Sequence, residues 1–373
     1  MIDSSNPHRL FERISLVIAC LLAGILGGSL FGRTTVAPIL PAASPSAAAS
    51  SPTPSATLSS SSPSELTRAA ALALASTVVV LSSNPGTLTG SGTLVGSDGL
   101  ILTDRHVVHG FSTIEIELPG STIPQAATVL ALDSLTDLAL LRLVSPPLSP
   151  LPALSLGSSD ALSMGAPLAV VGDPLGSYPG TLTVGVLSGR ARTLTLNDGS
   201  VLYDLLQVDA AVSPGMSGGP VVDVAGNLIG IVSSIVEPLR ASGLSFVLPI
   251  EVAKALIEEA KTGKPLARAS LGLSFRVLGA DEAKGAGVTP GAVLLDGTAN
   301  SPAIDPGGPA ERAGLRAGDI ITAIAGIAVS EASPYAFSLS RAQPGVALKI
   351  EIRRTGTAIS LSITPDAMLL PTS

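Results

Sequence analysis

The sequence predicts an all-β protein whose main body is a barrel or a sandwich. Between residues 77 and 246, apolar runs of strand length alternate with glycine-containing turns, and little helical periodicity interrupts them. Many short strands at such spacing are typical of barrels and sandwiches. A smaller unit with further strands follows. The expected strands of the main body are TVVVL, GTLVG, LILT, STIEIEL, AATVLAL, LALLRL, APLAVVG, GTLTVGVLSG, LLQVD, PVVDV, LIGIVSSI and LSFVLPI.

Composition limits the classes of function. The 373 residues suffice for two domains with separate cores. Aromatic residues make up 2% of the chain and the formal net charge is −7, which argues against nucleic-acid binding, because such binding uses basic patches and stacking side chains. Cys20 is the one cysteine, so an intramolecular disulfide is excluded. Three histidines are too few for a convincing zinc cluster.

An apolar span over residues 14–31 predicts a single transmembrane anchor. Its uncharged residues would cover about 27 Å as a helix, close to the hydrocarbon thickness of a bilayer. Arg9 and Arg13 precede the span, whereas only Arg33 follows it closely. The positive-inside rule therefore leaves residues 1–13 in the cytoplasm and the bulk of the chain outside.

Two alternatives to an anchor remain open. Cys20 follows a Val-Ile-Ala sequence as in a lipoprotein signal, but the apolar run before it is short and a further apolar run follows it. Cleavage of a signal peptide after Ala37 would put Pro38 beside the scissile bond, which is unfavourable. We expect a retained anchor.

Residues 32–64 are predicted to be a disordered linker. From Thr34 onward this segment is rich in Pro, Ser and Ala, carries no charge up to residue 63 and has almost no large apolar side chain. Such a composition cannot bury a core. The folded part is expected to begin near Glu65, with a short helix over the sequence LTRAAALALAS.

The apolar period changes to that of a helix from residue 250. Gly263 is expected to end this helix, and residues 264–269 form a short basic linker. We therefore predict one domain over residues 65–263 and a second over residues 270–367. The apolar residues that share one face of the helix are Ile250, Ala253, Leu256 and Ile257.

The second unit is predicted to be a compact, partly open barrel with at most two short helices and an exposed edge strand. Its glycine-rich loop separates the first two strands from the last three. The expected strands are LGLSFRVL, GAVLLDG, DIITAIAGIAV, VALKIEIRR and TAISLSIT.

A glycine-rich turn, SPGMSGGP over residues 213–220, marks Ser217 as a candidate nucleophile. Glycines on both sides allow a substrate carbonyl to approach the hydroxyl closely, with backbone N–H groups directed at the oxyanion. Ser217 would then need a base and an orienting acid.

Two histidines are candidates for the base. His106 stands at the end of an apolar strand in the sequence LTDRHVV, and His109 follows beside Gly110. Histidine suits the role because its ordinary pKa lies near neutrality, so it can accept the serine proton and return it to a leaving amine. The residues alone do not choose between the two.

Asp137 is the candidate orienting acid, because it stands immediately before an almost wholly apolar strand. Its neighbour Asp133 lies in a Leu-Asp-Ser-Leu turn and is expected to be solvated. A carboxylate in this role fixes the imidazole tautomer and stabilises the imidazolium. The order His, Asp, Ser on an all-β scaffold is that of two-barrel serine proteases, whereas α/β-hydrolases run Ser, Asp, His.

These segments closely resemble the HtrA/Deg family of trypsin-like serine proteases. The family's GSG…ILTN.HVV, TDLA.LK and NPGNSGGP motifs correspond to residues 90–108, 136–143 and 213–220. The resemblance covers about residues 66–367, and it implies a double six-stranded β-barrel for residues 65–263. It also favours His106 over His109, so that His106, Asp137 and Ser217 form the expected triad.

The family comparison implies further roles in the site. The N–H groups of Gly215 and Ser217 are expected to form the oxyanion hole. Val212 corresponds to the wall of the specificity pocket, and Ala211 supplies no charge at its base. We therefore expect cleavage after small or medium aliphatic residues.

Three residues depart from the family pattern. Met216 and Ser213 stand where the family usually has asparagine, which bears on how readily the oxyanion loop becomes ordered. Asp104 replaces the asparagine that precedes the histidine motif and alters the charge near His106.

The second unit resembles a bacterial PDZ domain. Residues 309–321, PAERAGLRAGDII, match the family signature, and Leu271-Gly272-Leu273 lie where a carboxylate-binding loop is expected. Such a loop holds a peptide C-terminus while the peptide adds a strand to the sheet edge. The long Gly- and Pro-rich segment over residues 285–309 is expected to alter or partly cover this groove.

The sequence thus predicts a membrane-anchored, extracytoplasmic serine endopeptidase that cleaves unfolded or damaged proteins in protein quality control and stress response. The resemblance implies a bacterial periplasm or cell exterior, no metal or other cofactor, peptide binding by the PDZ domain and a homotrimer. The alternative is a proteolytically weak or inactive PDZ scaffold or chaperone that binds unfolded polypeptides.

Overall fold

The fold is taken from a computed structural model, which describes residues 64–83, 87–145, 147–195, 201–233, 243–298, 301–331 and 333–372. All described residues belong to one compact unit, Ser61–Ser373. The predicted cytoplasmic segment, the predicted span and nearly all of the predicted linker lie outside the described residues. Among the described residues, no helix has the length and apolar character needed to cross a bilayer.

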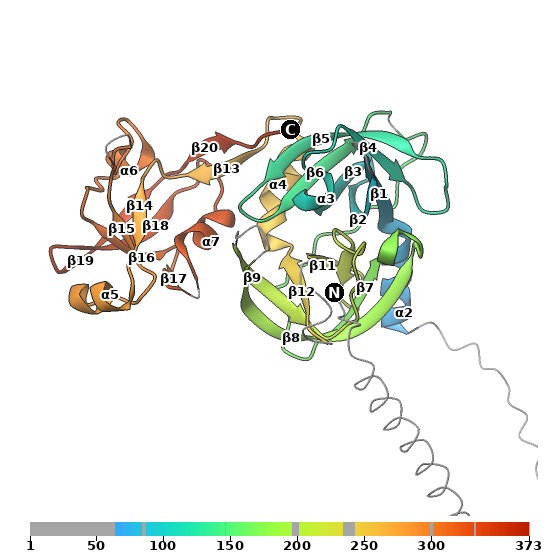
Figure 1. The fold of residues 1–373 in the computed structure, drawn as a ribbon, viewed down its shortest axis with the longest axis horizontal. Coiled ribbons are helices and arrows are strands. Elements are labelled where there is room, and N and C mark those ends of the chain that lie inside the picture. The colour runs from blue at the N-terminus through green and yellow to red at the C-terminus, as the bar shows by residue number, and fades with distance from the viewer. Residues whose placement is uncertain are drawn as a thin grey trace, which may run out of the picture. The chain divides into compact units, whose positions relative to one another are not determined.

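Two closed six-stranded barrels form the main body, as the family resemblance implies (Figure 1). The strand orders are β1-β2-β3-β6-β5-β4 and β10-β11-β12-β9-β8-β7, with antiparallel pairs throughout. The first barrel consists of β1 (Thr77–Ser83), β2 (Thr87–Gly96), β3 (Leu100–Asp104), β4 (Thr113–Glu117), β5 (Gln125–Asp133) and β6 (Leu138–Leu143). The second consists of β7 (Pro167–Gly172), β8 (Thr181–Thr195), β9 (Val201–Val208), β10 (Pro220–Val222), β11 (Leu228–Val232) and β12 (Ser245–Pro249).

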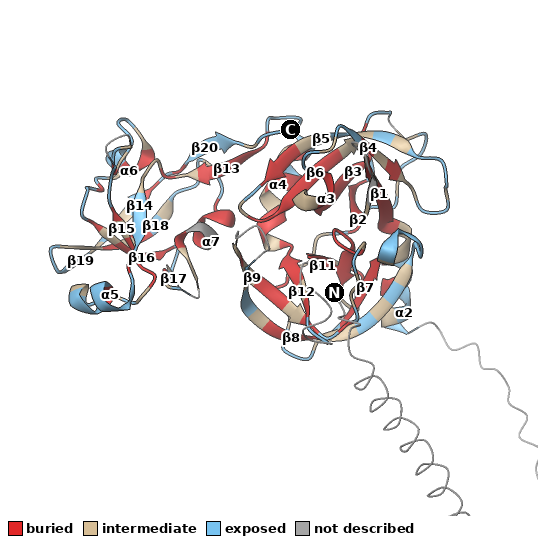
Figure 2. Cartoon of the chain, viewed as in Figure 1, coloured by how far each residue is buried: buried red, intermediate tan, exposed pale blue. Residues whose placement is uncertain are grey.

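Buried residues run through the strands of both barrels (Figure 2), and their aliphatic side chains form the core clusters. One buried cluster contains Ile101 and Leu141 of the first barrel, and a second contains Val170 and Val221 of the second. A third cluster joins side chains of both barrels. Strand β11 is buried along its whole length, which explains its apolar sequence LIGIV.

Two helices cover the cluster between the barrels. Helix α2 (Glu65–Ser76) buries Ala69, Ala70 and Ala73, and the side chain of Ser64 accepts a hydrogen bond from the Thr67 N–H at its start. The sequence predicts both this helix and the next one. Helix α4 (Glu251–Lys261) buries Val252, Ala253, Leu256, Ile257 and Ala260.

The second domain has a sheet of order β14-β15-β16-β18-β19, to which β17 adds beside β16. Its described part contains three short helices rather than the two at most that we expected. Among them, α5 has weak helical character in the sequence, because it is a seven-residue segment with an internal glycine. The elements are β14 (Phe275–Val277), α5 (Ala280–Ala286), β15 (Val293–Leu295), α6 (Pro309–Arg312), β16 (Ile320–Ile324), β17 (Ile327–Ala328), α7 (Tyr335–Ser340), β18 (Leu348–Arg354) and β19 (Thr357–Ile363).

A two-stranded sheet joins the linker to the end of the chain. Strand β13 (Ala267–Ser270) pairs with β20 (Asp366–Leu369), so the residues that we expected to be a linker are partly a strand. Beyond β20, the carbonyl of Pro371 accepts a hydrogen bond from the Leu132 N–H at 2.7 Å.

Asp133 is buried and not solvated, so the sequence-based expectation for it was wrong. Its side chain is 3% exposed and accepts a hydrogen bond of 2.9 Å from Nε of Arg268, whose side chain is also 3% exposed. Arg268 lies in β13 and donates in addition to the carbonyl of Ser340. The partner that holds Asp133 in the interior is therefore distant in the sequence.

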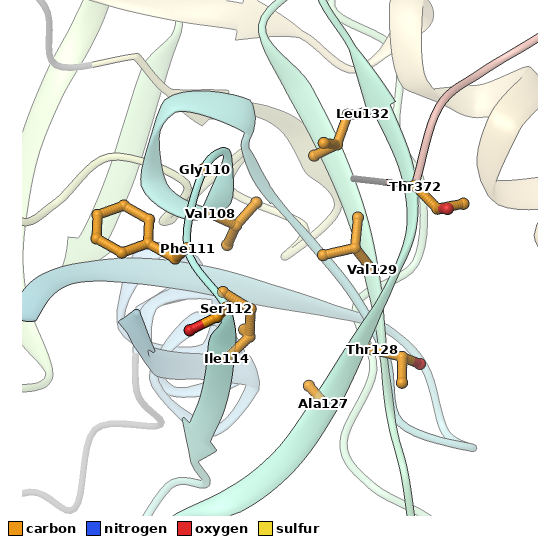
Figure 3. A pocket seen from close by; sticks show the side chains of 10 residues that line it. All are labelled: Val108, Gly110, Phe111, Ser112, Ile114, Ala127, Thr128, Val129, Leu132 and Thr372. Carbon is orange, nitrogen blue, oxygen red and sulfur yellow. The ribbon is translucent and has the colours of Figure 1, made fainter. Parts of the chain in front are cut away.

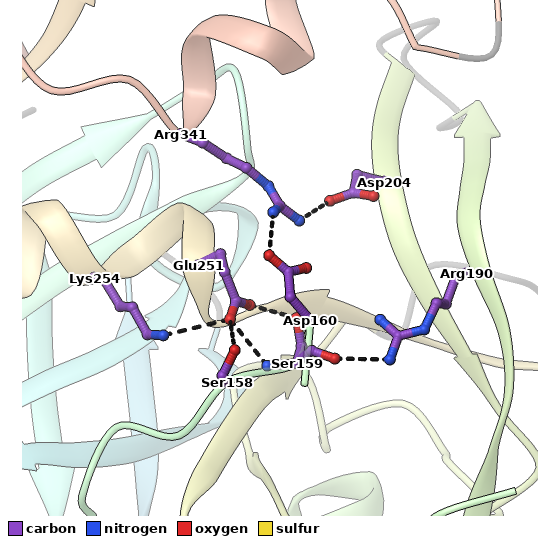
Figure 4. Close-up of polar contacts among 8 residues, drawn as sticks. All are labelled: Ser158, Ser159, Asp160, Arg190, Asp204, Glu251, Lys254 and Arg341. Atoms are coloured by element: carbon purple, nitrogen blue, oxygen red, sulfur yellow. Dashed lines mark hydrogen bonds and ion pairs between the residues drawn. The ribbon is translucent and has the colours of Figure 1, made fainter. Parts of the chain in front are cut away.

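A polar cluster links α7 to the second barrel (Figure 4). Arg341, immediately after α7, donates to the carboxylates of Asp160 and Asp204. In the same view, Glu251 at the start of α4 accepts hydrogen bonds from the hydroxyl of Ser158 and the backbone N–H of Ser159. The loop before β7 is therefore connected to the residue that follows α7 through Asp160, and to the start of α4 through Glu251.

The buried pair of Arg268 and Asp133 gives a stability prediction. Replacing Asp133→Asn leaves Arg268 buried without its counter-charge, which should lower the free energy of unfolding by about 3–5 kcal/mol. Denaturant titration of the full chain measures this change.

The matched control is Glu282→Gln. It breaks an ion pair with Arg276 in which both side chains are largely exposed, so it should leave the transition midpoint unchanged. Equal decreases of the free energy of unfolding in Asp133→Asn and Glu282→Gln would show that the buried ion pair stabilises the protein no more than the exposed one.

Candidate active site

His106 and Asp137 are in direct contact at one end of the first barrel. His106 lies in the short helix α3 (Arg105–Val108) that follows β3, and Asp137 immediately precedes β6. Nδ1 of His106 lies 2.6 Å from Oδ2 of Asp137, and the backbone N–H of His106 donates to Oδ1 of Asp137 at 3.1 Å. Because β3 and β6 are paired neighbours, the barrel itself brings these residues together.

The backbone of Asp137 is held in an unusual conformation. Its φ is +57°, a value that aspartate adopts more readily than most residues. The carbonyl of Asp137 accepts a hydrogen bond from the Arg105 N–H at 2.6 Å. Backbone and side chain of Asp137 therefore both bind the segment that carries His106.

The pKa of His106 is raised above the ordinary imidazole value. Burial lowers this pKa, but the hydrogen bond to Asp137, the charge that Asp104 carries when it is ionised and the charge of Asp137 outweigh burial. The charge of Arg105 opposes them. The competing candidate, His109, is exposed at the end of α3.

The turn that carries Ser217 lies against the first barrel. The N–H of Ser91 in β2 donates to the carbonyl of Ser217 at 2.9 Å, and the Thr93 hydroxyl donates to the Gly218 carbonyl at 3.0 Å. Gly218 has φ +84°, and a Cβ there would collide with Ser91 O and Thr103 Oγ1. Ser217 is therefore held beside the barrel that carries His106.

Ser91 also fixes the residues on the other side of the turn. Its hydroxyl donates to the Gly215 carbonyl at 2.8 Å and accepts from the Asp173 N–H at 2.9 Å. The carbonyl of Pro214 accepts from the N–H of Leu175 at 2.7 Å, which directs the Gly215 N–H the opposite way, because the two groups of a trans peptide point apart. Ser91 was not singled out from the sequence.

The segment that meets this turn is η1 (Pro174–Gly176), a single 3₁₀ turn. Leu175 has φ +60°, which is unusual for leucine, and its side chain is exposed. Burial of the leucine side chain therefore does not stabilise this backbone conformation. Glycine at residue 215 is required because a Cβ there would collide with the carbonyl of Asp173.

Met216 is part of the second barrel's core. Its side chain is 1% exposed and packs in one cluster with Ala210 and Val221. A Cβ at Gly172 would lie 2.8 Å from that of Met216, which shows how closely β7 approaches the turn. The Met216 N–H donates to the Ser213 carbonyl at 3.1 Å. This departure from the family pattern therefore supports the turn by packing.

The two residues predicted for the specificity pocket differ in exposure. Val212 is half-buried and packs against the second barrel's core, whereas Ala211 is exposed. Their assignment to the specificity pocket stays a prediction.

Asp104 is a second carboxyl group at the end of β3, next to the pair of His106 and Asp137. It is 0% exposed, and neither of its carboxyl oxygens has a hydrogen-bond partner among the described residues. Burial raises the pKa of Asp104 well above its usual range, and the charge of Asp137 raises it further. His106 and the Gly218 N–H act in the opposite direction.

Asp104, His106 and Asp137 form the one group in the described ranges whose ligand-type atoms could converge on a metal ion, since these atoms lie within 4.8 Å of one another. Nδ1 of His106 is already bonded to Asp137. We therefore assign no metal to these residues.

The predicted peptide loop of the second domain is tied to the segment that follows β15. The Gly272 carbonyl accepts from the Asp305 N–H at 3.0 Å, and Leu273 forms a bridge with Ile304. Leu271 is buried in the domain core, and Gly272 has φ +63°. Strand β14, next along the chain, is at the edge of its sheet.

A cavity of about 500 Å³ lies beside the loop that follows His106 (Figure 3). Phe111 and Ile114 come from that loop and β4, Val129 and Leu132 come from β5, and Thr372 comes from the end of the chain. None of the three predicted triad residues lines it. The cavity is therefore separate from the candidate catalytic residues.

Family models match both domains. Residues 90–231 match a trypsin-like peptidase domain, and residues 301–354 match a PDZ domain. A Synechocystis protein that is named as a putative serine protease, HhoA, is 33% identical over 296 residues, which are 76% of this chain and 72% of HhoA. The chain belongs to the HtrA family of trypsin-like serine proteases.

Solved structures of the family agree. The chain is similar to the HtrA-type protease AlgW with a bound tripeptide, at a TM-score of 0.60 and 30% identity, over 83% of this chain and 99% of AlgW. A DegP-like periplasmic serine endoprotease of Halomonas elongata is 33% identical over 74% of this chain. The chain spans about half the length of such DegP-like relatives, covering 56% of that protein.

The hydrogen bonds of Ser91 give a prediction for the site. Ser91→Ala should slow the labelling of Ser217 by a fluorophosphonate by about 10- to 100-fold, because small displacements of reacting groups have effects of this size. Labelling rates followed by in-gel fluorescence measure it.

The control is Ser112→Ala, which removes an exposed hydroxyl that donates to the Ser83 carbonyl in β1, at 3.3 Å. This variant should react like the wild type. A Ser91→Ala protein that folds and reacts at the same rate would show that the turn does not depend on Ser91.

Proposed function

We propose that this chain is a serine endopeptidase of the HtrA type that cleaves unfolded or damaged polypeptides outside the cytoplasm. The observation that carries the proposal is the 2.6 Å contact between Nδ1 of His106 and Oδ2 of Asp137. It occurs where the turn of Ser217 is hydrogen-bonded to β2. Family membership and the names of the relatives support the same activity.

In the proposed reaction Ser217 Oγ attacks the scissile carbonyl and forms an ester with the acyl part of the substrate. His106 accepts the serine proton and delivers it to the leaving amine as the C–N bond breaks. Water then attacks the ester, again with His106 as the base. Asp137 orients the imidazole and stabilises its protonated form.

The oxyanion of each tetrahedral intermediate would be bound by the N–H groups of Gly215 and Ser217. The hydrogen bonds that hold the carbonyls of Pro214 and Gly215 support this role, since they restrict rotation of the peptide groups next to Gly215. No metal or other cofactor takes part in the proposed reaction.

The PDZ domain is proposed to bind peptide C-termini. Backbone N–H groups of Leu271, Gly272 and Leu273 would hold the carboxylate, and the peptide would add a strand beside β14. The position of β14 at the sheet edge supports this mode. Segment 301–305 is hydrogen-bonded to the carboxylate-binding loop, through Asp305 to Gly272 and through Ile304 to Leu273. It would therefore limit the space for the side chain of the last peptide residue.

We also propose an extracytoplasmic location, supported by the relatives that are named as periplasmic, with residues 14–31 as the membrane anchor. A homotrimer is proposed from the family alone. Membrane fractionation and light scattering test these two points, and a soluble or monomeric full chain would contradict them.

The central experiment compares wild type with Ser217→Ala. The wild type should react with a fluorophosphonate at Ser217 and degrade casein, and the variant should lose both reactions, with hydrolysis falling by at least about 10⁴-fold. Ser121→Ala, which removes a hydroxyl from the surface turn after β4, is the control and should remain fully active.

A scaffold or chaperone without protease activity would give a different result. It would resist the probe and bind unfolded polypeptides equally well with and without Ser217. The close contact of His106 and Asp137 does not favour this alternative.

The specificity pocket that we propose at Ala211 and Val212 carries no charge, and this predicts the substrate preference. Peptides with Ala, Val or Leu before the scissile bond should be cleaved at least about 10-fold faster, as kcat/KM, than matched peptides with Lys or Arg, because a charge would be buried without a partner. A peptide library read by mass spectrometry measures this preference. Efficient cleavage after Lys or Arg alone would contradict it.

A further inference from the structure

Asp104 has the environment of a functional group that the triad does not use. Its carboxyl group is fully buried at the end of β3, and neither oxygen has a hydrogen-bond partner among the described residues. A buried polar group of this kind destabilises a fold by comparison with an apolar side chain. The hydroxyl of the preceding residue, Thr103, donates to the carbonyl of Ser91 and not to Asp104. Leu138, which pairs with Asp104 across the sheet, has an apolar side chain.

The groups that face Asp104 come from three segments. His106 belongs to α3, Asp137 precedes β6, and Gly218 belongs to the turn of Ser217. The charge of Arg105, also in α3, acts on His106. The N–H of Gly218 is already engaged, since it donates to the Val232 carbonyl at 2.9 Å. The imidazole of His106 is therefore the group whose charge can respond to that of Asp104.

The distances make this response direct. Ligand-type atoms of Asp104, His106 and Asp137 all lie within 4.8 Å of one another. The side chain of Asp104 is screened from water, whereas that of His106 is 36% exposed. Charges at such separations interact strongly when little water lies between them.

We propose that Asp104 is a positioning residue for the acid–base cycle of His106. Asp104 is neutral in the pH range where His106 first loses its proton. At higher pH Asp104 is ionised, and its negative charge makes His106 a stronger base. The proposal rests on the proposed function, since it takes His106 as the general base. Asp104 does not touch the substrate. It acts through His106 alone.

Proton balance defines three states of the site. With Asp137 ionised, the lowest-pH state carries protons on both Asp104 and His106, and its net charge is zero. Loss of one proton to solvent leaves Asp104 neutral and His106 a neutral base. Loss of the second proton leaves a carboxylate at Asp104, which stabilises the imidazolium that forms when His106 accepts the serine proton.

The wild type should therefore show two ascending steps in the pH dependence of kcat/KM rather than one. The second step should raise the rate by at least about threefold, because a nearby carboxylate lowers the energy of the imidazolium transition state. These steps belong to the coupled pair of Asp104 and His106 and not to one residue.

Asp104→Asn in the full chain removes the titration and keeps the shape of the side chain. Its profile should have a single step close to the first step of the wild type, because an amide is neutral like the protonated carboxyl group, and the second step should be absent. Glu117→Gln in β4 removes the same charge from a side chain on the first barrel and should keep both steps. Identical profiles for wild type and Asp104→Asn would overturn the proposal.

A second measurement does not depend on catalysis. In the Ser217→Ala background, the NMR titration of the His106 imidazole should be biphasic when Asp104 is present and monophasic in the Asp104→Asn variant. The imidazole signal is assigned as the one lost in His106→Gln. A titration that does not change between the two proteins would overturn the proposal.

Stability gives a third readout with a defined sign. Because burial raises the pKa of Asp104, its contribution to stability is present at low pH and is lost as the pH rises through the folded-state value. The gain in Tm from Asp104→Asn should therefore be larger at pH 9 than at pH 5. A gain that does not vary with pH would count against the proposal.

The failures of the two proposals are distinguishable. A wild type that resists the fluorophosphonate contradicts the proposed protease function, whatever the NMR and Tm results are. An active enzyme whose His106 titration is the same with and without the Asp104→Asn substitution contradicts the role of Asp104 only.

Discussion

The site depends on the contact between β2 of the first barrel and the turn of Ser217 in the second. The carbonyls of Gly215, Ser217 and Gly218 accept hydrogen bonds from Ser91 and Thr93. Gly218 leaves no space for a side chain at this contact. The turn of the candidate nucleophile is thus held against the barrel that carries the candidate base and acid, and an insertion or a larger residue here would disturb this contact.

Three buried aspartates in the first barrel show how partners determine role. Asp133 is paired with Arg268, and this pair ties β5 to the strand that leads into the second domain. Asp137 is bonded to His106, whose basicity it supports. Asp104 lacks such a bond, so its protonation remains sensitive to its neighbours. The same type of side chain is thus paired with arginine in one place and is proposed to orient or to modulate a histidine in the other two.

Local patterns predicted the strands of the two barrels, because glycine turns delimit the strands. They also marked Ser217 and Asp137 as candidates, whereas the family resemblance was needed to prefer His106 over His109. Contacts between distant residues were not predictable. Asp133 was expected to be solvated since its partner is 135 residues away, and the role of Ser91 depends on residues 82 and 124 positions away. The number of short helices in the second domain was underestimated, because segments such as α5, seven residues with a glycine, give little helical signal.

Trapping the acyl-enzyme is the sharpest test of the proposed serine-protease mechanism. A peptide ester with alanine before the scissile bond is mixed with the full chain, quenched in acid within milliseconds, and the digest is analysed by mass spectrometry. The acyl group should be found on Ser217, and its amount in the steady state should change with pH. Turnover of the ester without an adduct on Ser217, or with the adduct on another residue, would contradict this mechanism.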